Sequence, residues 1–209
     1  MLGARYVEYI HDELIAGLWA SAGAVSGKGC RDLNLPESVV SRPFQTVFGN
    51  DAYPTVLKKG VALFHSLIPN HPFHDGNKRT AVTAFYAFLL SNGHYFFLTN
   101  EEAYSIAKAT ASYRERGLTH DQVLAEIEER LQDWVSPFTI LKASAKTDPA
   151  IRRTFEKVKK ARLLIRRLGR EDAVKLSNAL RAALHEDKRR TGGAEQPVEE
   201  VGQECPTYG

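Results

Sequence analysis

The sequence predicts an all-α bundle with a short β-hairpin flap and a C-terminal helical extension. Apolar residues recur at helical spacings of three and four along most of the chain. One stretch, Phe44 to Tyr53, instead alternates aromatic and polar residues, which is typical of a hairpin. Of the 209 residues, 43% are hydrophobic, and this is enough to build a core. A wholly disordered chain is therefore excluded.

The charge distribution divides the chain into three segments. Residues 1–135 carry 12 Lys and Arg against 15 Asp and Glu, whereas residues 136–190 carry 16 against 6. Residues 191–209 contain four Glu and no Lys or Arg. We therefore expect a globular domain over residues 1–137, a basic helical hairpin over 138–190 and an acidic disordered tail over 191–209. The basic segment makes nucleic acid a possible partner through residues 138–190.

In the first half of the chain, the helical signals surround the flap. An amphipathic helix is indicated by Val7, Ile10, Leu14, Ile15 and Leu18. A Gly/Ser-rich loop over 26–29 and a short helix between Pro36 and Pro43 follow. The flap turns around Gly49-Asn50, and its exposed edge suits a target-docking role better than a cover over the core. Apolar positions from Thr55 to Leu67 then predict a buried helix that Pro69 ends.

In the second half, helix-start signals are clear. Residues 81–90 are almost wholly apolar, so this helix is expected at the centre of the bundle, with Asn92-Gly93 as its stop. Thr99 with Glu102 predicts a capping box, and Thr119 predicts a second helix start. The extension is expected to contain two helices, from Asp148-Pro149 to Gly169 and from Ala173 to Leu184.

Several classes of protein are excluded by composition. No apolar run approaches the roughly 20 residues of a membrane span, and the first residues lack a signal-peptide pattern. We therefore expect a cytoplasmic protein with no membrane partner. The two cysteines, Cys30 and Cys205, lie far apart, so a disulfide framework and a C-x-x-C metal site are both excluded.

Residues 71–80, His-Pro-Phe-His-Asp-Gly-Asn-Lys-Arg-Thr, carry residue types suited to binding phosphates. Gly76 allows a tight turn, and the N–H groups at the start of the following helix form a natural nest for phosphate. Asn77 can line this nest. Lys78 and Arg79 offer positive charge to a polyphosphate. We therefore expect a nucleotide-binding site at Gly76, Asn77, Lys78 and Arg79.

The same segment also offers a base and a metal ligand. His71 is a candidate general base, because histidine ordinarily titrates near neutrality. Asp75 is a hard oxygen ligand suited to Mg²⁺. Together with the phosphate nest, these two residues indicate nucleotide phosphoryl chemistry.

The segment resembles the signature of the Fic/Doc family, His-x-Phe-x-(Asp/Glu)-Gly-Asn-x-Arg. Further similarity to its death-on-curing (Doc) branch extends over about residues 5–135. The residues that match the signature are His71, Phe73, Asp75, Gly76, Asn77 and Arg79. The resemblance implies a Fic/Doc helical bundle, with residues 1–137 as its catalytic domain.

The sequence departs from the many family members that transfer AMP. Those proteins usually have Gly where this chain has Lys78, and a second Arg where it has Val82. Similarity to the Doc branch instead implies transfer of the γ-phosphoryl group of ATP, with Mg²⁺, to a Ser or Thr hydroxyl of a protein. It also implies a toxin with an antitoxin partner, and elongation factor Tu as a possible substrate.

Three alternatives remain open at this stage. The same site can transfer AMP, or the chain can be a non-catalytic module that binds nucleic acid or an antitoxin. A metal-dependent phosphohydrolase would use His71, His74 and Asp75, and would recruit His65 or His94. This last interpretation leaves Gly76, Asn77 and Arg79 without a role.

Overall fold

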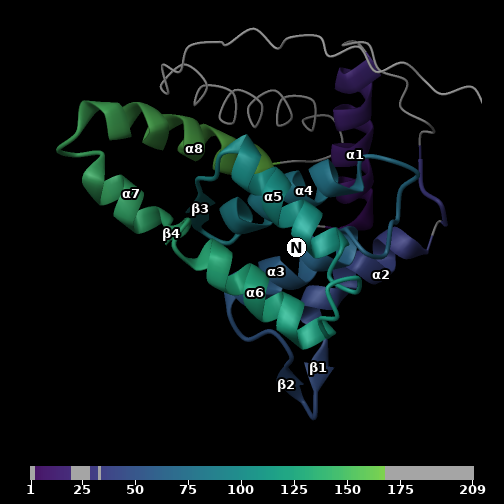
Figure 1. Ribbon diagram of the computed structural model, residues 1–209. Coiled ribbons are helices and arrows are strands. Elements are labelled where there is room, and N and C mark those ends of the chain that lie inside the picture. Colours follow the sequence, from purple (N-terminus) through teal and green to yellow (C-terminus); the bar gives the residue numbers. More distant parts are fainter. Residues whose placement is uncertain (1–2, 20–28, 33, 168–209) are drawn as a thin grey trace, which may run out of the picture.

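The structure is a computed structural model that describes residues 3–19, 29–32 and 34–167 (Figure 1). These residues are mostly helical with two short antiparallel strand pairs, which confirms the predicted fold class. The helices are α1 (Ala4–Trp19), α2 (Leu35–Ser41), α3 (Val56–Leu67), α4 (Asn77–Ser91), α5 (Asn100–Ala111), α6 (His120–Gln132), α7 (Phe138–Ser144) and α8 (Pro149–Arg167). The strands are β1 (Thr46–Val47), β2 (Asn50–Asp51), β3 (His94–Phe96) and β4 (Val135–Pro137).

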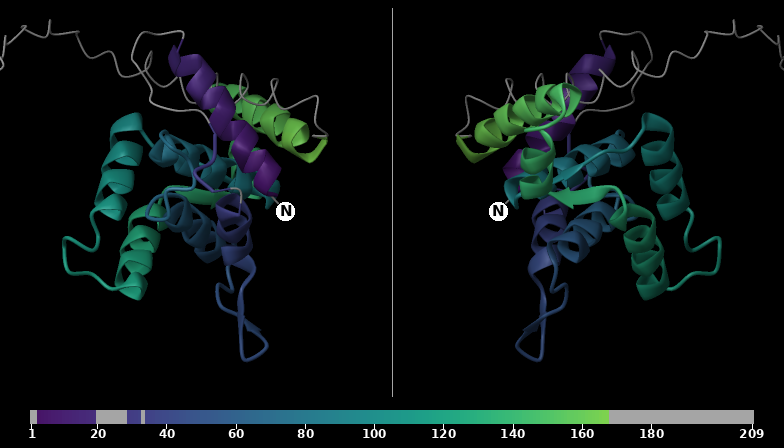
Figure 2. Two further views of the ribbon diagram at one scale, coloured as in Figure 1. Left: turned by 90° about the vertical axis from the view of Figure 1, so that its right-hand side faces the viewer. Right: turned by 90° about the vertical axis from the view of Figure 1, so that its left-hand side faces the viewer.

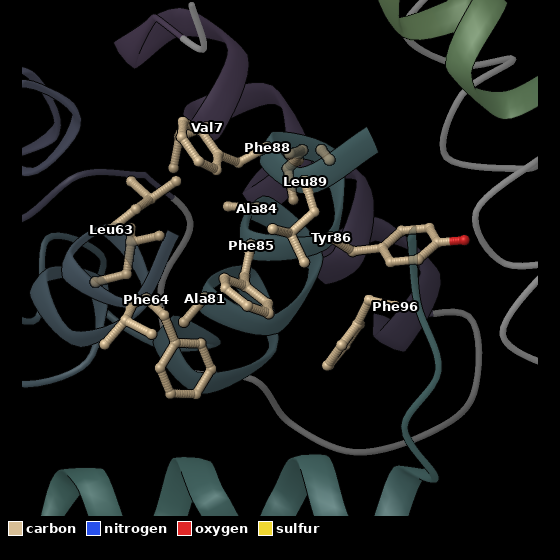
Figure 3. Packing of buried hydrophobic residues seen from close by; sticks show 14 of the residues in the cluster. Val7, Leu63, Phe64, Ala81, Ala84, Phe85, Tyr86, Phe88, Leu89 and Phe96 are labelled. Carbon is tan, nitrogen blue, oxygen red and sulfur yellow. The ribbon is translucent and has the colours of Figure 1, made fainter. Parts of the chain in front are cut away.

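Helix α4 lies at the centre of the bundle, as its apolar sequence predicts. It packs against α3, and also contacts α1, α5 and α8 (Figure 1). A Cβ at Gly60 of α3 would lie 2.7 Å from Cε2 of Phe85 in α4, so these two helices approach each other closely. Figure 3 shows Phe85 between side chains of α3 and β3, with Phe96 on one side and Phe64 on the other.

The predicted helix starts are confirmed by their capping contacts. The side chain of Thr55 accepts a hydrogen bond from the Lys58 N–H at 3.1 Å. Thr99 and Thr119 each form a complete capping box with the residue three positions later. These caps fix where α3, α5 and α6 begin.

The hairpin of β1 and β2 projects from the helical body (Figures 1 and 2). Thr46 pairs with Asp51 and Val47 with Asn50. The turn is therefore Phe48-Gly49, one residue earlier than the sequence pattern indicates. Both turn residues have positive φ, 51° and 81°, as a two-residue turn of the I′ type requires. This turn leaves Phe48 99% exposed at the tip.

Strands β3 and β4, helix α7 and a 3-10 turn at Arg42–Phe44 were not predicted. Strand β4 pairs antiparallel with β3, with His94 opposite Pro137 and Phe96 opposite Val135. Helix α7 follows immediately, and its first N–H, from Phe138, bonds to the Gly93 carbonyl at 2.9 Å. The chain after α6 is thus joined back to the end of α4 before α8 begins.

Helix α8 packs against the central helix. Val158 and Ala161 are buried in the same core as α4, and Phe155 stacks on Phe138 with ring centroids 5.1 Å apart. The division of the chain at Pro137 stays a prediction, which a chain ending there would test. None of the helices in residues 3–19, 29–32 and 34–167 has the length and hydropathy of a membrane span.

Several sequence-based expectations concern residues that the structure does not describe. These are most of the Gly/Ser-rich loop over 26–29, the second helix of the extension over 173–184, the acidic tail over 191–209 and Cys205. Cys30 lies in the described part and is a free cysteine, as expected.

Candidate active site

Residues 68–76 join α3 to α4 and carry most of the motif, and we call them the motif loop. The side chain of Asn77, the first residue of α4, stabilises this loop. This buried side chain accepts a hydrogen bond from the Phe73 N–H at 3.0 Å and donates one to the Phe73 carbonyl at 2.9 Å. Both polar groups of the amide are therefore occupied within the loop. The sequence pattern suggests that the Asn77 side chain lines the phosphate nest. In the structure this side chain bonds to Phe73, and the backbone N–H of Asn77 is the group that remains at the start of α4.

The segment around Cys30 also stabilises the motif loop. The Arg31 N–H donates to the Pro72 carbonyl at 2.8 Å, and Cys30 and Phe73 form an isolated antiparallel bridge. The motif loop is therefore held against this segment on one side and by the Asn77 contacts on the other.

His11 of α1 also contacts the motif loop. It was not predicted as a site residue. Its fully buried imidazole stacks on the Phe73 ring, with centroids 3.9 Å apart. Nε2 donates to the carbonyl oxygen of Asp75 at 3.0 Å, and Nδ1 lies 3.1 Å from Oδ1 of Asp12. The sequence holds a signal for this contact, because His11 falls on the apolar face of α1, midway between Val7 and Ile15. A polar ring at such a position needs a polar partner.

Gly76 marks the turn from the loop into α4 and adopts a left-handed conformation with φ 75°. A Cβ at this position would lie 2.9 Å from Cδ1 of Ile15, so a side chain is excluded by space as well as by φ. No side chain caps the start of α4. The N–H groups of Asn77, Lys78 and Arg79 are thus the unpaired donors that a helix N-terminus offers to an anion.

Four side chains of the motif are exposed around this helix start: His71, Asp75, Lys78 and Arg79. His71 lies four residues after the end of α3 and has φ 45°, an uncommon conformation for a non-glycine residue. Lys78 and Arg79 form no ion pair with any residue that the structure describes. Within residues 71–79 the described chain therefore carries an exposed imidazole, an exposed carboxylate and two exposed cations, next in sequence to an uncapped helix N-terminus. His74 is also exposed.

Asp75 suits a magnesium ion that is shared with phosphate. Its Oδ1 accepts the Gly76 N–H, and no hydrogen bond in the described chain uses Oδ2. No group of three His, Cys, Asp or Glu that would hold a metal ion occurs among the described residues. Mg²⁺ is commonly bound by one or two carboxylates, with phosphate oxygens and waters completing its coordination. The donor set fits that arrangement rather than an all-protein metal cage.

The histidines that a phosphohydrolase would recruit lie in other contacts. His65 packs edge-on against His120, with ring centroids 4.7 Å apart, and Nδ1 of His94 lies 3.1 Å from the Asn92 carbonyl oxygen. The described residues therefore do not assemble a histidine cluster around His71 and Asp75.

His65 and His120 form a separate polar cluster between α3 and α6. Nη2 of Arg42 donates to Nε2 of His120 at 2.8 Å, whereas Nε2 of His65 is buried and has no partner in the described chain. Burial, together with the nearby His120, Arg42 and Arg114, lowers the pKa of His65 from 6.5 to about 4. Burial and Arg42 also lower the pKa of His120.

Val82 stands at the position where, according to the family resemblance, members that transfer AMP usually have a second arginine. It lines a small apolar cavity with side chains of α3, α4, α5 and α6. The remaining lining residues are Phe64, Phe85, Phe96, Leu98, Ala103, Ile106 and Leu131. Position 82 therefore belongs to the core packing of α4.

Comparison with known proteins identifies a family for the first part of the chain. Residues 2–89 match the sequence model of the Fic/DOC family. Over 88 residues the chain is 46% identical to a protein named Toxin Doc from Mycolicibacterium smegmatis, and this match covers 41% of the chain and 65% of that relative. The chain thus spans slightly less than two thirds of the relative's length. No solved structure matches the chain.

Proposed function

Because residues 2–89 match the sequence model of the Fic/DOC family, we propose that this protein is a toxin-like enzyme that modifies a target protein. Its reaction is transfer of the γ-phosphoryl group of ATP to a Ser or Thr hydroxyl. The observation that carries this proposal is the exposed His71 beside the uncapped start of α4, where Lys78 and Arg79 are free of ion pairs within the described residues.

His71 is the general base in this proposal. It takes the proton from the target hydroxyl as that oxygen attacks the γ-phosphorus, and the bond from the γ-phosphorus to the β–γ bridging oxygen breaks. ADP leaves with the negative charge of that bridging oxygen. No covalent intermediate with the protein is needed, so the chain contributes mainly position and charge.

The start of α4 holds the polyphosphate. The N–H groups of residues 77–79 and the side chains of Lys78 and Arg79 are donors that stabilise the charge of the transferred group. Asp75 holds Mg²⁺, which when bound neutralises charge on the phosphate oxygens. Asn77 and His11 act on the loop that carries these groups, because their polar atoms bond to its backbone.

The β1–β2 hairpin is the proposed docking element for the target. Its tip exposes Phe48 fully and Val47 by about half, an apolar surface that projects from the body (Figure 2). The hairpin is tied to α3 by an ion pair of 2.6 Å between Lys59 Nζ and Asp51 Oδ2. An extended target segment can add main-chain hydrogen bonds to such an edge.

The choice of transferred group depends on how the nucleotide lies in the site. Lys78 adds a positive charge next to Arg79 in the sequence. Val82 is apolar, so this chain lacks the second arginine that family members transferring AMP usually have at that position. We therefore favour γ-phosphoryl transfer, and AMP transfer is the alternative for the same site. We also propose that an antitoxin restrains the enzyme and that its substrate is a translation elongation factor.

Labelled ATP tests the reaction directly. The protein is incubated with Mg²⁺ and a bacterial lysate, or with purified elongation factor Tu, and with ATP labelled at either the α or the γ phosphate. Label from the γ position alone supports the kinase, whereas label from the α position identifies AMP transfer. His74→Ala is the matched control for His71→Ala, because both histidines are exposed in the same loop. No transfer in any arm contradicts the proposed enzyme.

A further inference from the structure

The chain segment that forms α7 and α8 is strongly basic. Residues 138–163 contain eight Lys and Arg against two Asp and Glu, a net charge of +6. The apolar face of α8 is already used, because Val158 and Ala161 are buried in the core with α4. The outer face of α8 consists of its exposed residues, which include the cations Arg152, Arg153, Lys159 and Lys160.

Some of these cations have structural contacts. The guanidinium of Arg152 donates to the carbonyls of Ala145 and Lys146 at the end of α7, and that of Arg162 lies 5.0 Å from the centre of the Phe138 ring. These contacts hold the corner between α7 and α8. Arg152 is nevertheless exposed, so its charge also contributes to the surface of α8.

Other cations have no such role. Arg153 and Lys160 are exposed, and neither forms an ion pair or hydrogen bond within the described residues. They are seven residues apart, which places them on one side of the helix about two turns apart. Lys159 beside them is exposed and shares one weak ion pair, of 3.4 Å, with Glu156. Neighbouring α7 adds the exposed Lys142, and the turn between α7 and α8 adds the exposed Lys146.

We propose that the outer face of α8, formed by Arg152, Arg153, Lys159 and Lys160, docks the phosphate backbone of double-stranded nucleic acid. The face extends about 12 Å from Arg152 to Lys160 at the helical rise per residue. A DNA duplex presents one negative charge per about 1.7 Å of its axis, or about seven phosphates over this length. The two charge densities are complementary, and the contact does not depend on base sequence.

A duplex fits this face better than a single strand. Proteins that hold single strands stack the bases on exposed aromatic side chains. The exposed large hydrophobic residues of the described part of α7 and α8 are Ile140 and Leu163, both aliphatic. An acidic protein segment is the competing partner, and residues 191–209 of this chain, with four Glu, are one such segment. The docking is independent of the proposed phosphoryl transfer.

The first test is the salt dependence of binding. The full chain is titrated into a fluorescein-labelled DNA duplex of mixed sequence and about 20 base pairs. If three or four phosphates are neutralised, raising salt from about 50 to about 200 mM lowers affinity about 40- to 150-fold, because bound counterions are released. Absence of duplex binding at the lower salt concentration overturns the proposal.

The second test assigns the binding to α8. Arg153→Gln with Lys160→Gln removes two cations from the face, so the slope of log affinity against log salt should become shallower by about 1.8. Lys58→Gln with Lys108→Gln makes the same change in net charge on α3 and α5 and should leave the slope as in the parent. An equal effect of both pairs, or none from the α8 pair, overturns the assignment. Binding of a labelled poly-glutamate peptide without binding of the duplex would overturn nucleic acid as the partner. It would show that the face binds an acidic protein.

Discussion

The imidazole of His11 lies almost parallel to the ring of Phe73, with planes 9° apart and centroids at 3.9 Å. The same imidazole holds the carbonyl of Asp75 at 3.0 Å. One buried side chain of α1 thus contacts two residues of the motif, one through its ring face and one through a ring nitrogen. The conformation of the motif loop depends on the first helix, about 60 residues away in sequence.

Replacing His11 by Phe separates these two contacts. Phe keeps an aromatic ring against Phe73 but leaves the Asp75 carbonyl without its hydrogen bond. We expect a loss of about 1 to 3 kcal/mol in the free energy of unfolding, and weaker binding of ATP and Mg²⁺. Chemical denaturation and ATP titration measure these effects. A variant with the parent's stability and ATP affinity would show that the hydrogen bond has no such role.

Gly76→Ala tests the turn into α4. The added Cβ would meet Ile15 and would also sit at a positive φ, so we expect destabilisation of more than about 1 kcal/mol and weaker ATP binding. Gly117→Ala is the control, because Gly117 has φ 72° and no atom within 4 Å of the position that a Cβ would take. Ile15→Val removes Cδ1 and should partly rescue Gly76→Ala. An equal loss in both glycine variants would exclude the steric contribution.

The buried His65 predicts acid sensitivity of the fold. Its pKa is about 4 in the folded protein and ordinarily 6.5, so below pH 6.5 the unfolded chain binds a proton that the folded chain does not. Stability should therefore fall from pH 6.5 to about 4, by on the order of 3 kcal/mol from this group. Denaturant titrations across this range should show a smaller fall for His65→Phe. An identical pH dependence in the variant contradicts the assignment.

Phe48→Ser tests the hairpin as a docking element. Phe48 is 99% exposed, so the change should alter stability by less than about 0.5 kcal/mol. We expect KM for the target protein to rise several-fold while KM for ATP stays constant. Ile140→Ser, which changes an exposed apolar residue on α7, is the control. Equal target kinetics in the parent and Phe48→Ser would remove the hairpin from target binding.

Local signals predict much of this fold. Threonine caps, proline positions and apolar spacing place α1 to α6, because each of these features acts within a few residues. Strands β3 and β4 escape prediction because each has three residues and its partner lies about 40 positions away. Helix α7 escapes because its seven residues give a short apolar pattern and its start is fixed by a bond from Phe138 to Gly93.

The candidate site was predictable in its residues and not in all of their contacts. The spacing of His71, Asp75 and Arg79 identifies the motif, and Gly76 predicts the turn. That the Asn77 side chain braces Phe73, and that His11 supports Asp75, depends on packing between segments distant in sequence. The sequence shows such polar residues on apolar faces, but the partner becomes visible only when the helices are assembled.

The intact mass of the modified target tests the central claim most directly. Purified target is incubated with ATP, Mg²⁺ and either the parent protein, His74→Ala or His71→Ala, and then weighed by mass spectrometry. The account predicts a gain of about 80 Da, one phosphoryl group, with the parent and with His74→Ala, and no gain with His71→Ala. A gain of about 329 Da would show AMP transfer, and a gain of about 80 Da with His71→Ala at the parent's rate would contradict the role of His71.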